Sequence, residues 1–275
     1  MSRRTLGIIG TGALGCSIGL RARDNGCRVL GYDIDSSRLE EARAIEAIDA
    51  PASRDSLYVD AEILVLAAPI DATLNELTLL CSAPPVADLI IDIASVKAPI
   101  ADAARTLAQF VGTHPMAGTE RSGPTAANAR MFAGRTWAYV PSGNHVLDDS
   151  ACVLIRSLDA NPFAIDAQQH DKLLARTSHL PQLFASVFAA SLAKGTDNEV
   201  CADLCGPAAR ELQRLGRSRL DMWEAIFRCN AGNIAAEARR LAGALTAVAD
   251  ATASGDLTLL RETFGLTSAA WSEPL

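Results

Sequence analysis

Three glycines near the start of the chain have the spacing of a phosphate-binding turn. Gly10, Gly12 and Gly15 form the pattern GxGxxG directly after the apolar run 5–9. In such a turn the first glycine permits a sharp bend, the second lets a pyrophosphate approach the backbone, and the third allows close helix–strand contact. The amides at the start of the following helix face the phosphates. We therefore expect a dinucleotide site, although a glycine-rich turn that binds nothing has the same pattern.

An acidic residue follows at the distance that a ribose requires. Asp33 ends the second apolar run, 18 residues after Gly15, where a carboxylate holds the ribose diol. Because a carboxylate repels a 2′-phosphate, NAD is the expected cofactor rather than NADP, although the nearby Arg38 would soften this preference if it faced the site. The residues expected to contact the cofactor are Gly10, Thr11, Gly12, Ala13, Leu14, Gly15, Asp33, Ala68 and Pro69.

Two further residues follow apolar runs and have side chains suited to acid–base chemistry. Ser95 and His114 are both expected at the carboxyl edge of a parallel sheet, where ligands of such sheets bind. A histidine accepts a proton near neutral pH. Taken alone, His114 is better explained as a turn residue before Pro115, and Ser95 is equally well explained as the N-cap of the next helix. Lys97, one of three lysines, is expected on the surface at a helix start.

Five segments occur in an order and spacing that are specific to one enzyme family. They are DIASVK at 92–97, GTHPMAGTERSG at 112–123, HD at 170–171, SHLP at 178–181, and the segment 210–223. From about residue 5 to about residue 235, the chain resembles the prephenate/arogenate dehydrogenases of tyrosine biosynthesis. Because the resemblance accounts for most of the chain, we expect no fused chorismate mutase or regulatory domain, as in a monofunctional bacterial member.

The resemblance implies an NAD-dependent oxidative decarboxylation of arogenate or prephenate. A hydride leaves the ring carbon that bears the hydroxyl, and the ring carboxylate departs as carbon dioxide. The resemblance implies that His114 acts on this hydroxyl and that Ser95 hydrogen-bonds both the hydroxyl and His114. Arg210, Arg214 and Arg217 share a helical face, and Arg214 matches the family's carboxylate-binding arginine. The residues expected to contact the substrate are Arg214, His170, Gln182, Thr119 and Glu120.

Gln182 departs from the family pattern. Many members have Ser-His-Leu-Pro-His here, and the last histidine reaches the substrate. Glutamine keeps a hydrogen-bond donor and adds an acceptor, but it cannot carry a positive charge. Because arogenate carries an ammonium group that prephenate lacks, Gln182 favours arogenate, or both substrates. His179, close to Pro181 in the same segment, is expected to be structural, in a helix bent by the proline.

The first 166 residues predict the elements that position these side chains. Short apolar or β-branched runs alternate with helical stretches, which indicates βαβ units and an α/β fold with a Rossmann-type, doubly wound sheet. Several runs are apolar almost throughout, as in parallel strands that are covered on both faces. The expected strands are Thr5–Ile9, Arg28–Tyr32, Ile63–Ala67, Leu89–Ile93, Phe110–Thr113, Thr136–Val140 and one near Pro162–Ile165.

From residue 167 on, no strand-like run appears and apolar residues recur at helical spacing. We expect residues 1–166 to form a dinucleotide-binding domain, and residues 167–275 to form an all-helical domain that binds substrate and joins two subunits in a homodimer. The expected core positions of the helical part are Leu180, Phe184, Val187 or Phe188, Leu192, Met222, Ile226, Ile234 and Leu241.

Composition narrows the class of partner. The formal net charge of −7 argues against a nucleic-acid partner, and no apolar run reaches the roughly 18 residues that span a bilayer. Seven cysteines occur without a CxxC, which favours free thiols in the cytoplasm over disulfides. Cys201 and Cys205 are four residues apart, but two sulfurs alone do not make a zinc site, so no metal is expected.

Two other functions are compatible with the glycine turn. A β-hydroxyacid dehydrogenase has the same turn and a helical second domain, but it usually relies on a lysine there. Lys172 and Lys194 are the lysines of that part, and neither has a recognisable setting. A non-catalytic NAD sensor is the second alternative. The presence of Ser95, His114 and Arg214 in motif order argues against it.

Overall fold

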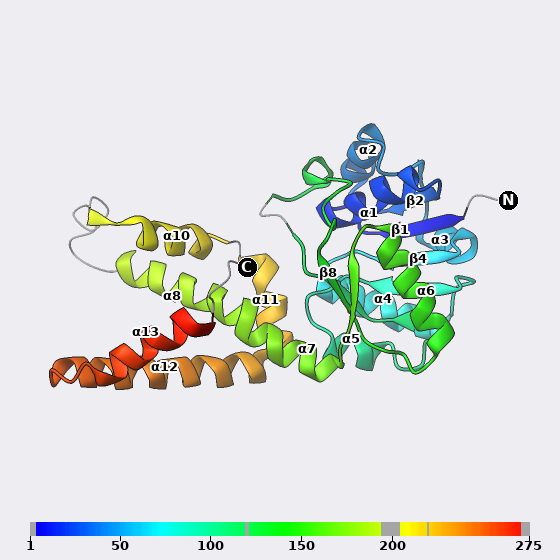
Figure 1. Cartoon of the computed structure of the whole chain (residues 1–275). Helices are drawn as coiled ribbons and strands as arrows, with labels where there is room; N and C mark the ends of the chain where they lie inside the picture. Colours follow the sequence, from blue (N-terminus) through cyan, green and yellow to red (C-terminus); the bar gives the residue numbers. More distant parts are fainter. Residues whose placement is uncertain (1–3, 119–120, 194–203, 219, 271–275) are drawn as a thin grey trace.

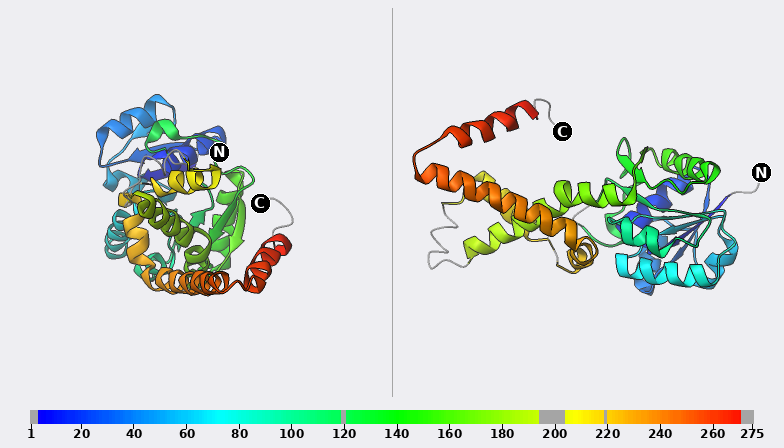
Figure 2. Two further views of the ribbon diagram at one scale, coloured as in Figure 1. Left: turned by 90° about the vertical axis from the view of Figure 1, so that its left-hand side faces the viewer. Right: turned by 90° about the horizontal axis from the view of Figure 1, so that it is seen from below.

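The protein consists of an α/β part followed by a helical part. The structure, a computed structural model, describes residues 4–118, 121–193, 204–218 and 220–270 (Figure 1). From Ala167 on, all regular elements in these ranges are helices. The helical part extends away from one side of the α/β part (Figure 2). The expected fold class is confirmed.

The first sheet has six parallel strands in the order β3-β2-β1-β4-β5-β6. The strands are β1 (Thr5–Ile9), β2 (Arg28–Tyr32), β3 (Ala50–Pro51), β4 (Ile63–Leu66), β5 (Leu89–Asp92) and β6 (Phe110–Val111). The predictions for β1, β2, β4 and β5 agree with the structure to within one residue at each end. The sequence did not predict β3, because it has only two residues and one is a proline.

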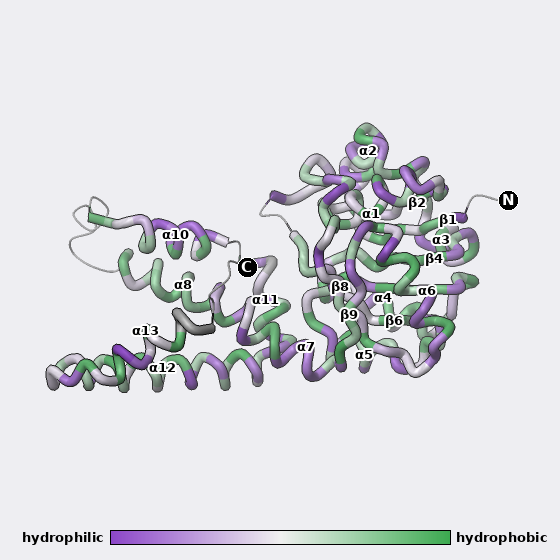
Figure 3. The backbone as a smooth tube through the Cα atoms, viewed as in Figure 1, coloured by the Kyte–Doolittle hydropathy of each residue, from purple (hydrophilic) through white to green (hydrophobic). Residues whose placement is uncertain are grey.

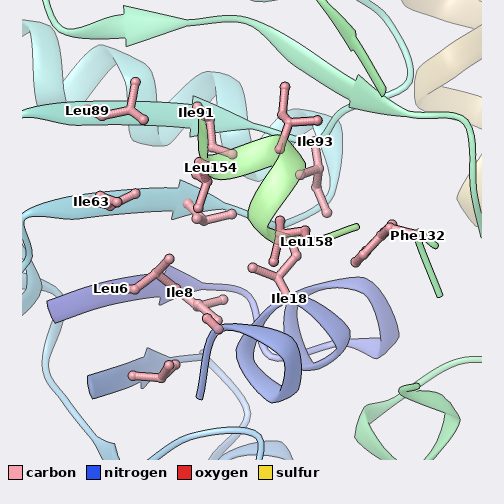
Figure 4. Packing of buried hydrophobic residues seen from close by; sticks show 14 of the residues in the cluster. Leu6, Ile8, Ile18, Ile63, Leu89, Ile91, Ile93, Phe132, Leu154 and Leu158 are labelled. Carbon is pink, nitrogen blue, oxygen red and sulfur yellow. The ribbon is translucent and has the colours of Figure 1, made fainter. Parts of the chain in front are cut away.

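Helices cover both faces of this sheet. They are α1 (Ala13–Asp24), α2 (Ser36–Ala44), α3 (Arg54–Asp60), α4 (Ile70–Ser82), α5 (Ala98–Ala103) and α6 (His145–Ser157). On one face, Ile8 of β1 shares a buried cluster with Ile18 of α1 and Leu154 of α6 (Figure 4). On the other face, Leu64 of β4 shares a second cluster with Leu57 of α3. Burial on both faces explains why these strands are continuously apolar.

A second sheet has three strands in the order β7-β8-β9. They are β7 (Thr113–Pro115), β8 (Thr136–Tyr139) and β9 (Asn161–Ala164), with β7 antiparallel and β9 parallel to β8. The prediction of one strand over 110–113 is therefore wrong. The chain leaves the first sheet at Gly112 and enters the second sheet one residue later, so His114 lies in β7 rather than at the end of a parallel strand.

The helical part consists of consecutive helices and one π-helical turn. They are α7 (Ala167–Leu174), the π-helical turn Ala175–His179, α8 (Leu180–Ala193), α10 (Pro207–Gly216), α11 (Leu220–Cys229), α12 (Ala231–Ala253) and α13 (Thr258–Ala270). Hydrophobic residues recur along α8 (Figure 3). Of the expected core positions, Leu180, Ile226 and Ile234 are buried, whereas Phe184 and Val187 are 36% and 60% exposed. The described part of the chain thus leaves these two apolar side chains of α8 uncovered.

No helix in the described ranges combines the length and the apolarity needed to cross a bilayer. The described cysteines are free thiols. The best buried of them, Cys16 in α1, donates its thiol to the carbonyl of Thr11, and burial raises the pKa of this thiol to about 12. It therefore stays protonated and packs as a small apolar side chain.

Candidate active site

The glycine turn between β1 and α1 has the backbone of a phosphate cradle. Gly10 has a φ of +102°, and a Cβ there would lie 2.6 Å from the carbonyl carbon of Ala67. A Cβ on Gly15 would overlap the carbonyl oxygen of Gly10, so the helix approaches the turn as closely as a glycine allows. Gly12, the N-cap of α1, has no atom within 4 Å of the place of a Cβ and no side-chain cap. The turn is closed at Gly10 and Gly15 and open at Gly12, which fits a bound pyrophosphate.

Asp33, directly after β2, is hydrogen-bonded to this turn. Its carboxylate accepts hydrogen bonds from the amide of Thr11 at 2.9 Å and from the hydroxyl of Thr11 at 3.3 Å. It also accepts one from the amide of Asp35 at 3.0 Å. The structure places the other expected cofactor contacts at the carboxyl ends of β1 and β4 or in the first turn of α1: Ala13, Leu14, Ala68 and Pro69. The residues predicted for the cofactor therefore lie at one edge of the sheet.

His114 is the first of three hydrogen-bonded side chains. Its Nδ1 lies 3.0 Å from Nε2 of His170, and the two rings meet edge to face. Nδ1 of His170 lies 2.8 Å from a carboxylate oxygen of Asp171. Because an ionised carboxylate only accepts, we assign His170 as a donor to Asp171 through Nδ1 and as an acceptor from His114 at Nε2. Nε2 of His114 is then left with a lone pair, as a proton acceptor requires.

The surroundings of His114 keep its ring neutral. Burial lowers the pKa of His114 well below its usual value, and electrostatic interactions with Lys97, His170 and His179 lower it further. At neutral pH the imidazole therefore carries no proton at Nε2 and can accept one.

Asp171 joins the helical part to the α/β part. Its carboxylate accepts hydrogen bonds from the amides of Lys97 at 2.7 Å and Ala98 at 2.9 Å, where α5 begins. Burial acts to raise the pKa of Asp171, but the hydrogen bonds from His170 and these amides outweigh it and hold the pKa below its usual value. The carboxylate is thus ionised. The sequence indicated no role for Asp171, because nothing local predicts that α7 meets the start of α5.

Lys97 is buried, so the expectation of a surface residue is wrong. Its side chain is 1% exposed, and its ammonium group forms an ion pair with Asp92. It also donates to the carbonyl of Thr113 at 2.7 Å. A lysine is buried in this way only when partners offset the loss of hydration. Those partners come from β5 and β7, which local sequence does not bring together.

Of three other predicted residues, Ser95 alone lies within the described ranges. Ser95 lies between β5 and α5 and is partly buried. Within the described ranges, no hydrogen bond joins its hydroxyl to His114, whose Nδ1 is paired with His170 instead. Thr119 and Glu120 lie outside the described residues.

Two predicted substrate contacts lie on the helices beyond the π-helical turn. Gln182 of α8 is buried, and its amide donates to the carbonyl of Leu215 at 2.9 Å while its oxygen accepts from Ser218 at 3.3 Å. Gln182 thus joins α8 to the end of α10. Arg214 of α10 is exposed and forms an ion pair with Glu211 at 2.7 Å. Among the described residues, neither side chain is hydrogen-bonded to His114, His170 or Asp171.

A cavity of about 250 Å³ opens beside the strand that carries His114. It is lined by Met116, Ala117, Gly118, Met131 and Arg135. The sulfur of Met131 contacts the hydroxyl of Ser17 on α1 at 3.5 Å, so one residue that lines the cavity packs against the helix of the glycine turn. The sequence did not single out Met131 or Arg135, because both follow a long loop without a recognisable motif.

His179 ends the π-helical turn, where the sequence predicted a helix bent by Pro181. Its Nδ1 lies 3.2 Å from the side-chain amide nitrogen of Asn230, which also donates to the carbonyl of Asp171 at 2.7 Å. The proton of the neutral ring therefore sits on Nε2, which is buried and has no hydrogen-bond partner among the described residues. Burial lowers the pKa of His179 to about 4.

The buried state of His179 predicts a loss of stability in acid. Between pH 6.5 and about 4 the unfolded chain binds a proton at this ring and the folded chain does not, so the free energy of unfolding falls as the pH falls. The contribution of His179 to this fall is about 3 kcal/mol. Urea unfolding at both pH values should show a smaller fall in His179→Gln than in the wild type. Equal falls would contradict the assigned burial of a neutral ring.

Comparisons with known proteins match both parts of the chain. Residues 18–156 match the sequence model of a prephenate dehydrogenase nucleotide-binding domain, and residues 166–266 match that of a prephenate dehydrogenase dimerization domain. NovF of Streptomyces niveus, described as a probable prephenate dehydrogenase, is 32% identical over 252 residues, which cover 86% of this chain and 66% of NovF. The chain spans 64 to 66% of the length of the curated relatives that it matches.

Solved structures match over nearly the whole chain. Prephenate dehydrogenase from Aquifex aeolicus, in complex with hydroxyphenyl propionate and NAD+, superposes with a TM-score of 0.90 at 21% identity and covers 98% of both chains. Arogenate dehydrogenase from Synechocystis superposes with a TM-score of 0.80 at 23% identity, over 97% of this chain and 99% of that one. At these identities the likeness concerns the fold.

Proposed function

Because the chain belongs to the prephenate/arogenate dehydrogenase family, we propose that it oxidises prephenate, arogenate or both, with NAD as the cofactor and release of carbon dioxide. The observation that carries this proposal is the hydrogen-bonded chain from Asp171 through His170 to His114. It ends in a neutral imidazole, two residues before Met116, which lines the cavity described above.

The glycine turn fits the cofactor. Gly12 leaves room for a pyrophosphate at the start of α1, and Asp33 lies at the end of β2, where a ribose diol would be held. NAD, when bound, supplies the hydride acceptor. The negative charge of Asp33 disfavours the extra phosphate of NADP.

His114 accepts the proton of the ring hydroxyl through Nε2. As the proton arrives, Nδ1 of His114 stays bonded to His170, whose own Nδ1 stays bonded to the ionised Asp171. The carboxylate therefore stabilises the positive charge that develops on the paired rings, as a buried acid does for a catalytic histidine.

The remaining assignments concern the substrate. Ser95, on the loop that leads to α5, would donate to or accept from the same hydroxyl, and Arg214 would bind a carboxylate. Thr119, Glu120 and Gln182 complete the proposed contacts. Since the amide of Gln182 is engaged by α10, the preference for arogenate rests on its lack of charge and not on a free donor.

The helical part also supports a proposal about assembly. We assign residues 1–166 to a dinucleotide-binding domain and residues 167–275 to a helical domain that joins two copies of the chain. The exposed apolar side chains of Phe184 and Val187 on α8, and of Leu245 on α12, would be covered in such a homodimer.

Reduction of NAD tests this function directly. With prephenate or arogenate present, NADH absorbance should rise with release of one carbon dioxide for each NADH, and more slowly when NADP replaces NAD. A matched reaction without NAD should show no turnover. Binding of NAD without turnover of either substrate would contradict the proposal and favour a sensor.

A further inference from the structure

The ammonium group of Lys97 lies in the protein interior and is not used in the mechanism above. It pairs with Asp92 at the end of β5 and donates to the carbonyl of Thr113 in β7. Lys97 and Asp92 are 1% and 0% exposed at their side chains. The pair therefore connects the end of β5 to β7, the strand that carries His114.

Thr113, the residue before His114, is held at every polar atom. Its amide donates to the Asp92 carboxylate at 2.9 Å, and its hydroxyl donates to the carbonyl of Asp92. The same hydroxyl accepts from the indole nitrogen of Trp137 at 2.9 Å, while the carbonyl of Thr113 accepts from Lys97. Four hydrogen bonds thus fix the position of the backbone immediately before His114.

Burying the ion pair of Lys97 and Asp92 is energetically unfavourable compared with burying apolar side chains. Removing a lysine and a carboxylate from water costs several kcal/mol, and well-packed apolar residues of similar volume often stabilise a core as much or more. The buried ion pair is therefore expected to add little to the stability of the fold. Because its hydrogen bonds are made to Thr113, the residue before His114, its geometry indicates a role in the site instead.

We propose that Lys97 is a positioning residue for the reaction assigned to His114: with Asp92 it holds Thr113, and so the His114 ring, at a fixed place. The inference rests on the proposed function of His114. Lys97 itself touches neither the ring nor a reacting atom.

Several charged or titratable groups surround His114. Lys97 precedes α5, His170 and Asp171 come from α7, and His179 comes from the π-helical turn. After burial itself, the positive charge of Lys97 has the largest effect in lowering the pKa of His114, although burial also lowers the pKa of Lys97. Removal of this lysine should therefore raise the pKa of His114, while loss of the Thr113 hydroxyl should disturb only the position of the ring.

Substitutions separate the two effects. Lys97→Met should lower kcat about a hundredfold, since small displacements of a catalytic group cost this much, and should raise the pKa of His114. Thr113→Val should lower kcat about tenfold with the pKa of His114 unchanged, and Thr113→Ser should restore kcat. Lys172→Met, at an exposed lysine of α7, is the matched control.

The pKa of His114 is read by NMR titration of the histidine ring signals, with His114→Asn used for assignment. This measurement needs no substrate, so it tests Lys97 even if the proposed reaction is wrong. If Lys97→Met does not fold, Asp92→Asn/Lys97→Met removes both charges and avoids a lone buried carboxylate. Wild-type kcat and an unchanged titration of His114 in the folded Lys97 variant would overturn the proposal, as would wild-type kcat in Thr113→Val.

Discussion

Replacing His114 with alanine is expected to lower kcat by about a thousandfold, which is within the range that a positioned acid–base group contributes. The affinity for NAD should stay unchanged, because the glycine turn and Asp33 make no hydrogen bond to His114 among the described residues. Turnover is measured as NADH absorbance, and cofactor affinity as quenching of tryptophan fluorescence.

The matched control for this substitution is His145→Ala. His145 begins α6 and is exposed, so its loss should leave kcat and NAD affinity at wild-type values. In the wild type, kcat/KM should fall only in acid well below pH 6.5, because the pKa of His114 is lowered and the free ring must be unprotonated to act. Wild-type turnover in His114→Ala would remove the assigned role.

Adding a single methyl group to the glycine turn is expected to have one of two opposite effects, depending on the glycine. In Gly12→Ala the new Cβ enters open space, so the free protein should fold normally. The same methyl would occupy the approach to the pyrophosphate. Because overpacking costs about 1–3 kcal/mol, NAD affinity should fall about 10- to 100-fold.

Gly15→Ala should act on the fold instead. Its Cβ would overlap the carbonyl oxygen of Gly10, which is backbone and cannot move aside without displacing β1 or α1. The free energy of unfolding should fall by about 3 kcal/mol. Gly243→Ala, on the exposed side of α12 with no atom within 4 Å, is the control and should keep NAD affinity. Normal NAD binding in Gly12→Ala would contradict the assigned pyrophosphate position.

The sequence was sufficient where the physical cause is local. The long apolar strands of the first sheet and the glycine turn were predicted because burial on both faces and a tight turn both restrict residue type directly. The strand over 110–113 was placed wrongly because Gly112 separates two short strands, and only their different partners reveal the break.

The sequence predicted several residues of the candidate site, but it did not predict the contacts between them. His114 and His170 were both identified, but their hydrogen bond depends on how α7 packs against α5. Lys97 was misjudged because a charged side chain is normally exposed, and the partners that allow its burial belong to other strands. The side chains of Met131 and Arg135, which line the cavity, had no signal in the sequence.

One carboxylate group has a consequence for how the molecule can move. Asp171 accepts hydrogen bonds from the start of α5 and from the ring that supports His114. Any motion that lifts α7 from α5 therefore breaks the support of His114 in the same step. A base at His114 that is oriented by this chain of hydrogen bonds would therefore require α7 and α5 to stay in contact, so the docking of two helices and the orientation of one ring are mechanically coupled.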